Sequence, residues 1–212
     1  LHMAASYNTI FTLSGIRESE IRDHSFLKNA PHDIIARTGG IGENPKLTSG
    51  GDIFAGTGGA KADDKIVRDA YKDFTGRYQD SISILKRSHD MFIENVNILS
   101  TVGPNAERNL ANFTKMEFEV HEPYGITLIE KVRAATALNG FQDYQDAPLL
   151  LTIEFKGFDD NGRPLGFKRK GGTDGLVRKI PILIARVDFD VNEGGAKYNV
   201  VAVPYTDLGF DD

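Results

Sequence analysis

Strict alternation of apolar and polar residues over short segments is the feature that most constrains the fold of this chain. In residues 111–121, apolar side chains occupy the even positions from Met116 to Val120, and charged or polar ones occupy the odd positions from Lys115 to His121. Residues 149–155 alternate again, with large apolar residues at all four odd positions. A period of two predicts β-strands that turn one face to the core and the other to water, as in antiparallel sheets.

Further segments predict strands by their β-branched and aromatic content. These are residues 7–13, 81–85, 90–102, 180–191 and 197–205. In residues 90–102 we expect Phe92, Val96 and Ile98 to share one face. Residues 180–191 begin with apolar residues at even positions and end with them at odd positions. This change predicts a bulge or sharp bend inside one strand, or a strand that passes from one sheet environment to another. Residues 192–195 (NEGG) predict a hairpin turn before the last strand.

The clearest helix is predicted over residues 126–138. Its apolar stripe consists of Leu128, Ile129, Val132, Ala135 and Thr136, with Glu130, Lys131 and Arg133 on the opposite side. Asn139-Gly140 is a typical helix end. A second helix is expected over residues 65–74, and one or two helical turns over 17–23 with Ser14 as N-cap, whereas residues 29–37 fit no single class.

These elements predict an α+β fold that is mainly antiparallel β. We expect a curled sheet or open β-barrel with one packed α-helix. Two parts are expected: residues 1–80, with an N-terminal strand, a Gly-rich arm and a short helix, and residues 81–212, with the barrel and the helix 126–138. Eight of the 27 residues in 38–64 are Gly, so we expect this segment to be mobile until it meets a partner.

Composition excludes several classes of protein. The 212 residues include no Cys, which rules out a disulfide framework, a thiol nucleophile and a thiolate zinc site. The formal charge of −5 argues against a dedicated nucleic-acid binder. No apolar run approaches the roughly 20 residues of a membrane-spanning helix, so no membrane anchor is expected.

Motifs for catalysis, metals or cofactors are not found in the sequence. The five histidines (His2, His24, His32, His89 and His121) have no metal-ligand spacing, and each is expected to be a surface or loop residue. No G-x-S-x-G is present, and residues 56–61 (GTGGAK) lack the Gly before Lys of a phosphate loop. Residues 159–162 (DDNG) fit a hairpin tip better than a calcium loop. We therefore expect no catalytic residue, metal site or cofactor, and not an enzyme.

Several segments, in this order, resemble one family. They are residues 31–37 (PHDIIAR), 90–96 (DMFIENV), 122–130 (EPYGITLIE), 147–159 (APLLLTIEFKGFD), 178–182 (RKIPI), 194–198 (GGAKY) and 203–205 (VPY). Over residues 7–205 the chain resembles the N-terminal part of virion structural proteins of contractile-tailed bacteriophages, of the baseplate-hub or tail-tube-related type. The resemblance implies a tail-tube-like curled sheet with a packed helix, in rings coaxial with the tail.

The expected partners follow from that resemblance. They are further copies of the chain in a trimeric or hexameric ring and neighbouring tail or baseplate proteins, in a virion assembled in the host cytoplasm. A charge of −5 suits a channel through which DNA passes, because a basic wall would retain phosphates. Family relatives are often longer, so the chain is expected to be a domain of a larger protein.

Candidate interface residues are aromatic and basic. We expect Phe54, Tyr71, Phe74 and Tyr78 to order against a neighbouring subunit. The basic run Lys168, Arg169 and Lys170 is either a solvated loop tip or a contact with an acidic partner. The alternatives to a ring component are a carbohydrate- or receptor-binding module, which the absence of Trp disfavours, and a cell-wall hydrolase domain.

Overall fold

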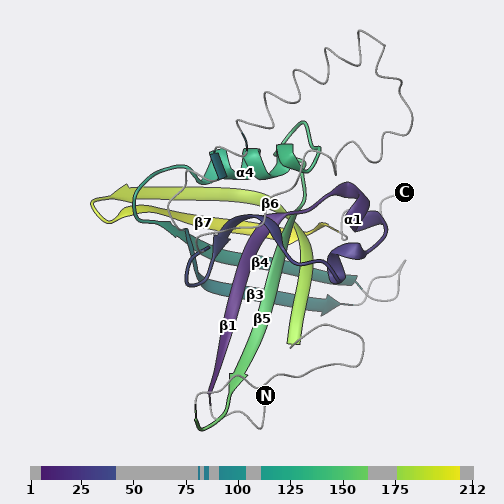
Figure 1. Cartoon of the computed structure of the whole chain (residues 1–212). Coiled ribbons are helices and arrows are strands. Elements are labelled where there is room, and N and C mark those ends of the chain that lie inside the picture. Colours follow the sequence, from purple (N-terminus) through teal and green to yellow (C-terminus); the bar gives the residue numbers. More distant parts are fainter. Residues whose placement is uncertain are drawn as a thin grey trace.

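The structure is a computed structural model that describes residues 6–41, 81, 84–85, 91–103, 111–161 and 176–205. In these residues one antiparallel sheet has the strand order β2-β1-β5-β6-β7-β4-β3 (Figure 1). The strands are β1 (Ser6–Gly15), β2 (His32–Arg37), β3 (Phe92–Gly103), β4 (Ala111–Glu122), β5 (Leu149–Phe158), β6 (Leu176–Asn192) and β7 (Gly195–Pro204). The helices are α1 (Glu18–Arg22), η1 (Ser25–Leu27) and α4 (Leu128–Leu138). The predicted α+β class, a curled and open antiparallel sheet with one packed helix, is confirmed.

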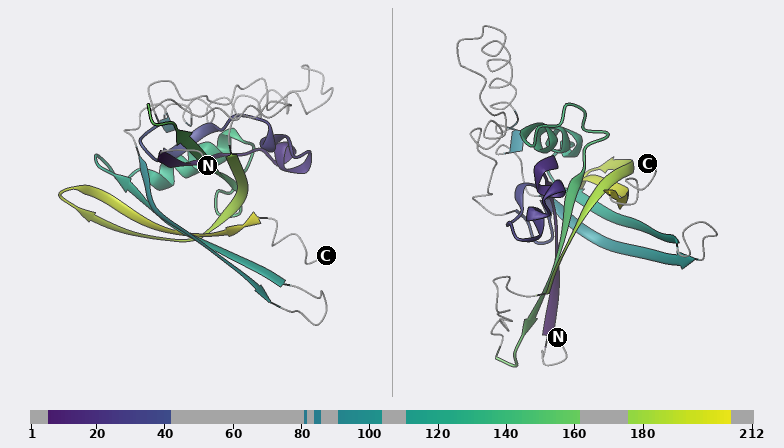
Figure 2. Two further views of the ribbon diagram at one scale, coloured as in Figure 1. Left: turned by 90° about the horizontal axis from the view of Figure 1, so that it is seen from below. Right: turned by 90° about the vertical axis from the view of Figure 1, so that its right-hand side faces the viewer.

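The long strand β6 bends the sheet. Its first part pairs with β5 as far as Ile182, and the rest pairs with β7, with a register shift between Ile184 and Arg186. The predicted change of phase inside this strand is therefore confirmed as a bulge. Figure 1 shows the result: β1 and β5 run across the direction of β3, β4 and β7. Figure 2 shows the β6–β7 hairpin and the β3–β4 pair extending away from α4.

The two ends of the sheet approach each other without closing it. The Arg37 backbone N–H donates to Met91 O at 3.0 Å, and Thr38 Oγ1 donates to Ile93 O at 3.2 Å. After Ile93, β3 diverges from β2 and the two strands do not pair, so the sheet stays open. Strands from residues 1–80 and from 81–212 thus belong to one sheet.

The main core lies between α4 and the inner face of the sheet. Phe118 of β4, Leu151 of β5 and Val200 of β7 contribute to it, with Leu128 and Val132 of α4. The predicted alternation in β4 is confirmed, because Met116, Phe118 and Val120 are buried. The face expected for β3 is wrong: Ile93 and the preceding residue Met91 are buried, Val96 is only partly buried, and Ile98 is exposed. A register shift between Glu94 and Asn97 changes the face within this strand.

Helix α4 begins two residues later than predicted and ends where predicted. Thr127 is its N-cap residue, Asn139 its C-cap, and Gly140 takes the left-handed φ of 91° that a helix end favours. The predicted side of the helix is wrong for two residues. Ile129 is 38% exposed, whereas Lys131 is completely buried, with its Nζ donating to Ile35 O at 3.5 Å.

The structure corrects or completes further predictions of local structure. Ser81, Ile84 and Leu85 are helical and not part of a strand, and the side chains of Ile84 and Leu85 pack on the main core. Ser14 lies in β1 and does not cap α1, whose N-cap residue is Arg17. Residues 29–37, which fitted no class, contain β2. The Gly-rich segment beyond residue 41 and the predicted helix 65–74 lie outside the described residues.

Within the described part of the chain, no helix combines the length and the apolar character needed to cross a membrane.

Candidate functional site

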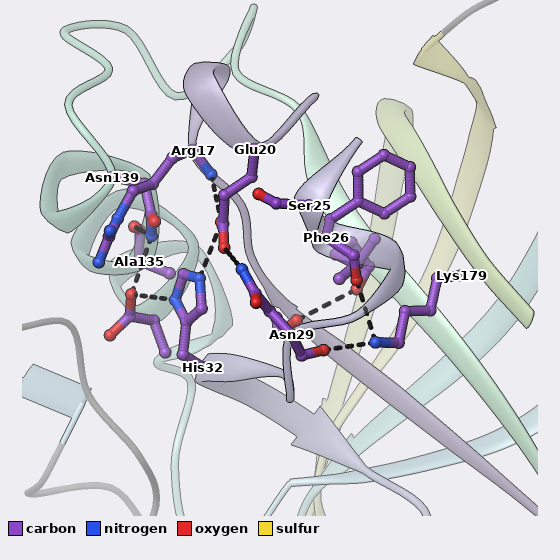
Figure 3. Close-up of polar contacts among 12 residues, drawn as sticks. Arg17, Glu20, Ser25, Phe26, Asn29, His32, Ala135, Asn139 and Lys179 are labelled. Atoms are coloured by element: carbon purple, nitrogen blue, oxygen red, sulfur yellow. Dashed lines mark hydrogen bonds and ion pairs between the residues drawn. The ribbon is translucent and has the colours of Figure 1, made fainter. Parts of the chain in front are cut away.

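The strongest concentration of buried polar side chains lies where the segment between β1 and β2 meets the end of α4. We define the His32 cluster as Glu20 of α1, His32 and Asp33 of β2, and Asn139 at the C-terminus of α4 (Figure 3). All four residues are buried. Buried charged groups require partners, so the hydrogen bonds of this cluster decide what it can do.

His32 is held on both ring nitrogens by carboxylates. Its Nε2 lies 3.0 Å from Glu20 Oε2, and its Nδ1 lies 2.9 Å from Asp33 Oδ2. Asp33 Oδ2 also accepts a 2.9 Å hydrogen bond from Asn139 Nδ2, which donates in addition to Ala135 O at 2.7 Å. A doubly protonated imidazole has two N–H donors and suits this arrangement.

Glu20 has two further donors from its own neighbourhood. Asn29 Nδ2 donates to Glu20 Oε1 at 2.8 Å, and the Arg17 backbone N–H donates to Glu20 Oε2 at 3.1 Å. The second bond closes the first turn of α1, as in a capping box. Glu20 therefore joins the start of α1 to β2.

The backbone around the cluster is adapted to it. Asp33 has a left-handed φ of 50°, which is costly for a residue other than Gly and is maintained here by the bonds of its side chain. A Cβ atom on Gly15 would lie 2.3 Å from Asn139 Nδ2 and 3.3 Å from the Asp33 Cβ. Only Gly therefore leaves room for the Asn139 amide at this point of β1.

The charges of the cluster stabilise one another. Burial by itself would lower the pKa of His32, but the hydrogen bonds and negative charges of Asp33 and Glu20 raise it to about 9. Burial would raise the pKa of Glu20, but the hydrogen bonds from His32, Asn29 and the Arg17 backbone lower it to about 2. At neutral pH the cluster thus contains an imidazolium between two carboxylates.

This arrangement is suited to holding segments together. A general base or a metal ligand needs a ring nitrogen that can reach substrate or metal, and both nitrogens of His32 are engaged by carboxylates. Among the described residues, no group of three or more His, Asp or Glu side chains has a geometry that would hold a metal ion. We therefore read the cluster as a clasp between α1, β2 and α4.

A second buried polar group lies at the other end of α4. Glu122 accepts hydrogen bonds from the Thr127 backbone N–H and from Thr127 Oγ1, both at 2.7 Å, and from the Tyr198 hydroxyl at 3.0 Å. The first bond satisfies one of the free N–H groups at the start of the helix. Burial, together with the bond to Glu122, raises the pKa of Tyr198. This group positions α4 on β4 and β7.

The expectation for the histidines was wrong in one case. His32 is buried in the cluster, whereas His24 is exposed beside η1 and His121 is partly exposed, its Nε2 lying 3.1 Å from Gly194 O. His2 and His89 lie outside the described residues. The two partners of His32 are Glu20, 12 residues earlier, and Asp33, the next residue. This spacing matches no known motif, so the sequence contains no signal for the cluster.

The seven candidate interface residues all lie outside the described residues. They are Phe54, Tyr71, Phe74, Tyr78, Lys168, Arg169 and Lys170. The tip after β5 is partly described: the Asn161 N–H donates to Asp159 Oδ1 at 2.9 Å, as in a tight turn.

Comparison of the chain with protein-family models, with curated proteins and with solved structures finds no match.

Proposed function

We propose that this protein is a non-enzymatic structural component of a bacteriophage tail, whose copies form or join a ring coaxial with the tail tube or baseplate hub. The observation that carries the proposal is the character of the free edges of its sheet. Natural proteins usually protect such edges with charged residues, Pro or bulges, since unpaired backbone groups recruit other strands.

The first free edge is the second half of β3. This strand is last in the sheet, and after the register shift it pairs with β4 from Asn97 to Gly103. Residues 97–103 (NILSTVG) contain neither a charged residue nor Pro, and Leu99 is 57% exposed. In the described part of the chain no strand pairs with the other side of these residues. This edge therefore has the properties of a surface that pairs with another strand.

The second free edge is the first half of β1. Strand β2 pairs with β1 only from Thr12 to Gly15. Residues 6–10 (SYNTI) are uncharged as well, and in the described residues they pair with β5 alone. Charged residues occur on other strands, for example Glu117 and Glu119 of β4 and Arg37 of the other terminal strand, β2. The uncharged stretches of β1 and β3 are therefore free edges without this protection.

Two different free edges on one subunit allow a head-to-tail contact. Such a contact closes into a ring when the rotation between neighbours divides a full turn. It needs no catalytic group, in agreement with the role of the His32 cluster as a clasp. The formal charge of −5 also suits a passage for DNA.

The test is self-association of the purified protein. Sedimentation velocity over a wide concentration range, with negative-stain electron microscopy at the highest concentration, is expected to show rings. Leu99→Lys, which places a charge on the β3 edge, is expected to raise the concentration needed for association about tenfold, equivalent to about 1.4 kcal/mol. Ile126→Lys is the matched control, because Ile126 is similarly exposed but lies between β4 and α4 and not in a strand.

Monomers at every concentration, both alone and with tail proteins added, would contradict the proposal. Equal effects of the two substitutions would show that the β3 edge is not the contact. Specific binding to a glycan array by such a monomer would favour the carbohydrate-binding alternative.

A further inference from the structure

The segment between β1 and β2 covers part of the outer face of the sheet, the face turned away from α4. It spans residues 16–31 and contains α1 and η1. Its apolar contacts form a small second cluster of Ile16, Phe26 and Leu150, with Ile21 beside it, which is separate from the main core. We call residues 16–31 the flap. Little apolar burial means that hydrophobic contacts contribute little to keeping it in place.

Two cationic side chains outside the flap hold it down. His32 binds Glu20 from β2, as described above. Lys179 of β6 donates from its Nζ to Phe26 O at 3.0 Å, to Leu27 O at 3.3 Å and to Asn29 O (Figure 3). Burial lowers the pKa of Lys179, which agrees with its position under the flap. The flap is therefore attached mainly by polar bonds at a few points.

The face beneath the flap has the composition of a solvent-facing surface. Leu149, Leu151 and Ile153 of β5 point to the main core, so Leu150 and Thr152 point to the outer face. Thr12 and Ser14 of β1 are the direct neighbours of Thr152 and Leu150 in the sheet. Thr12, Ser14 and Thr152 are nevertheless almost completely buried.

One of these hydroxyl groups is buried at a cost. Thr152 Oγ1 has no hydrogen-bond partner among the described residues. A hydroxyl group that gives up water without a replacement disfavours the closed state. Its direct neighbour on β6 is Lys179, the residue that binds the backbone of the flap, so opening of the flap would uncover this part of the sheet.

We infer that the flap opens as a local unit, while the seven-stranded sheet stays folded, and thereby exposes the hydroxyl-bearing outer face of β1 and β5. Three independent features support local opening: the small separate apolar cluster, the attachment through His32 and Lys179, and the unpartnered Thr152 hydroxyl. This inference does not depend on the proposed function.

The absence of Cys from the chain allows a clean test. A single-cysteine variant, Thr152→Cys, places a thiol under the flap, and Val200→Cys places one in the main core. The rate of thiol labelling under native conditions reports how often each site opens. The residue at 152 is expected to be labelled faster than that at 200, and with a weaker dependence on urea.

Two further substitutions separate local opening from global unfolding. His32→Gln removes a charge-assisted tie and is expected to raise labelling at position 152 roughly ten- to a hundredfold. Phe118→Leu weakens the main core, so it is expected to raise labelling at position 200 and to leave position 152 unchanged. Equal acceleration of both positions by Phe118→Leu would overturn the inference, because position 152 would then open only by global unfolding.

If Thr152→Cys does not fold, Ser14→Cys offers the same comparison from β1. Amide hydrogen exchange of the unsubstituted protein is a second measurement. Faster exchange in residues 16–31 than in β7, with little dependence on urea, is expected, and exchange of both segments at one common rate would contradict local opening.

Discussion

The free energy of unfolding is expected to depend on pH through His32, and the structure sets both the direction and the size of this dependence. The pKa of His32 rises from 6.5 in an unfolded chain to about 9 in the fold. A group with a raised pKa stabilises the fold fully below its unfolded pKa, and this contribution is lost as pH increases through the folded value. At about 1.4 kcal/mol per unit, the loss between pH 6.5 and pH 9 amounts to about 3 kcal/mol.

The acid side of the profile has the opposite sign and comes from Glu20. Its pKa is lowered from 4.5 to about 2, so its contribution is present above pH 4.5 and is lost as pH falls toward 2. Because the two shifts describe the same ion pair, they are not added. The cluster therefore predicts a plateau of stability between about pH 4.5 and pH 6.5.

Urea denaturation at a series of pH values measures this profile. The comparison is between the unsubstituted protein and His32→Gln, whose free energy of unfolding is expected to be lower at pH 6 and to change less between pH 6.5 and 9. The difference between the two proteins isolates His32 from other titrating groups. A difference that stays constant across this range would refute the assignment of an imidazolium between two carboxylates.

Three further substitutions test the packing around the two polar groups, each by urea denaturation. Gly15→Ala is expected to destabilise the fold by about 1–3 kcal/mol, because the new Cβ would lie 2.3 Å from Asn139 Nδ2. In an Asn139→Ala background much of this effect is expected to disappear, and additive costs of the two substitutions would contradict the clash. Gly195→Ala is expected to lower the free energy of unfolding by about 2–3 kcal/mol, because residue 195 has a φ of 109° and the new Cβ would lie 2.3 Å from Glu122 O. No change in stability would show that the β6–β7 turn can shift. Tyr198→Phe is expected to cost about 1 kcal/mol through its hydrogen bond to Glu122, and an equal cost in a Glu122→Ala background, which has no acceptor, would argue against that bond.

The prediction of strands and of their buried side chains was correct where one face of a strand is buried and the other faces water. In β4 the side chains alternate with the pleat, so a period of two in the sequence maps directly onto burial. The change of phase in residues 180–191 also predicted the bulge in β6, because an extra residue moves the following side chains to the other face. Prediction failed for β3, where a bulge breaks the pattern without any change in apolar spacing.

Burial of the charged residues could not be predicted from local patterns. The helical pattern places Lys131 on the wet side of α4, but α4 lies against β2 as well as the sheet core, and the Ile35 carbonyl group accepts a hydrogen bond from the Lys131 ammonium group. The sequence likewise predicts a surface position for His32, because its partners are not recognisable from the local pattern. Its pairing with Glu20 bridges 12 residues, and Asn139 reaches Asp33 across 106 residues.

The sequence by itself determined the class of fold, since alternation and helical periodicity are local properties that each segment expresses through its own backbone. It also determined the neutral character of the β1 and β3 segments, which is plain in the composition of residues 6–10 and 97–103. Only the tertiary structure decided that these segments lie at free edges, and that His32 lies between two carboxylates. Both depend on contacts such as the pairing of β1 with β5, far apart along the chain, whose free energy comes from the packed core and not from any one segment.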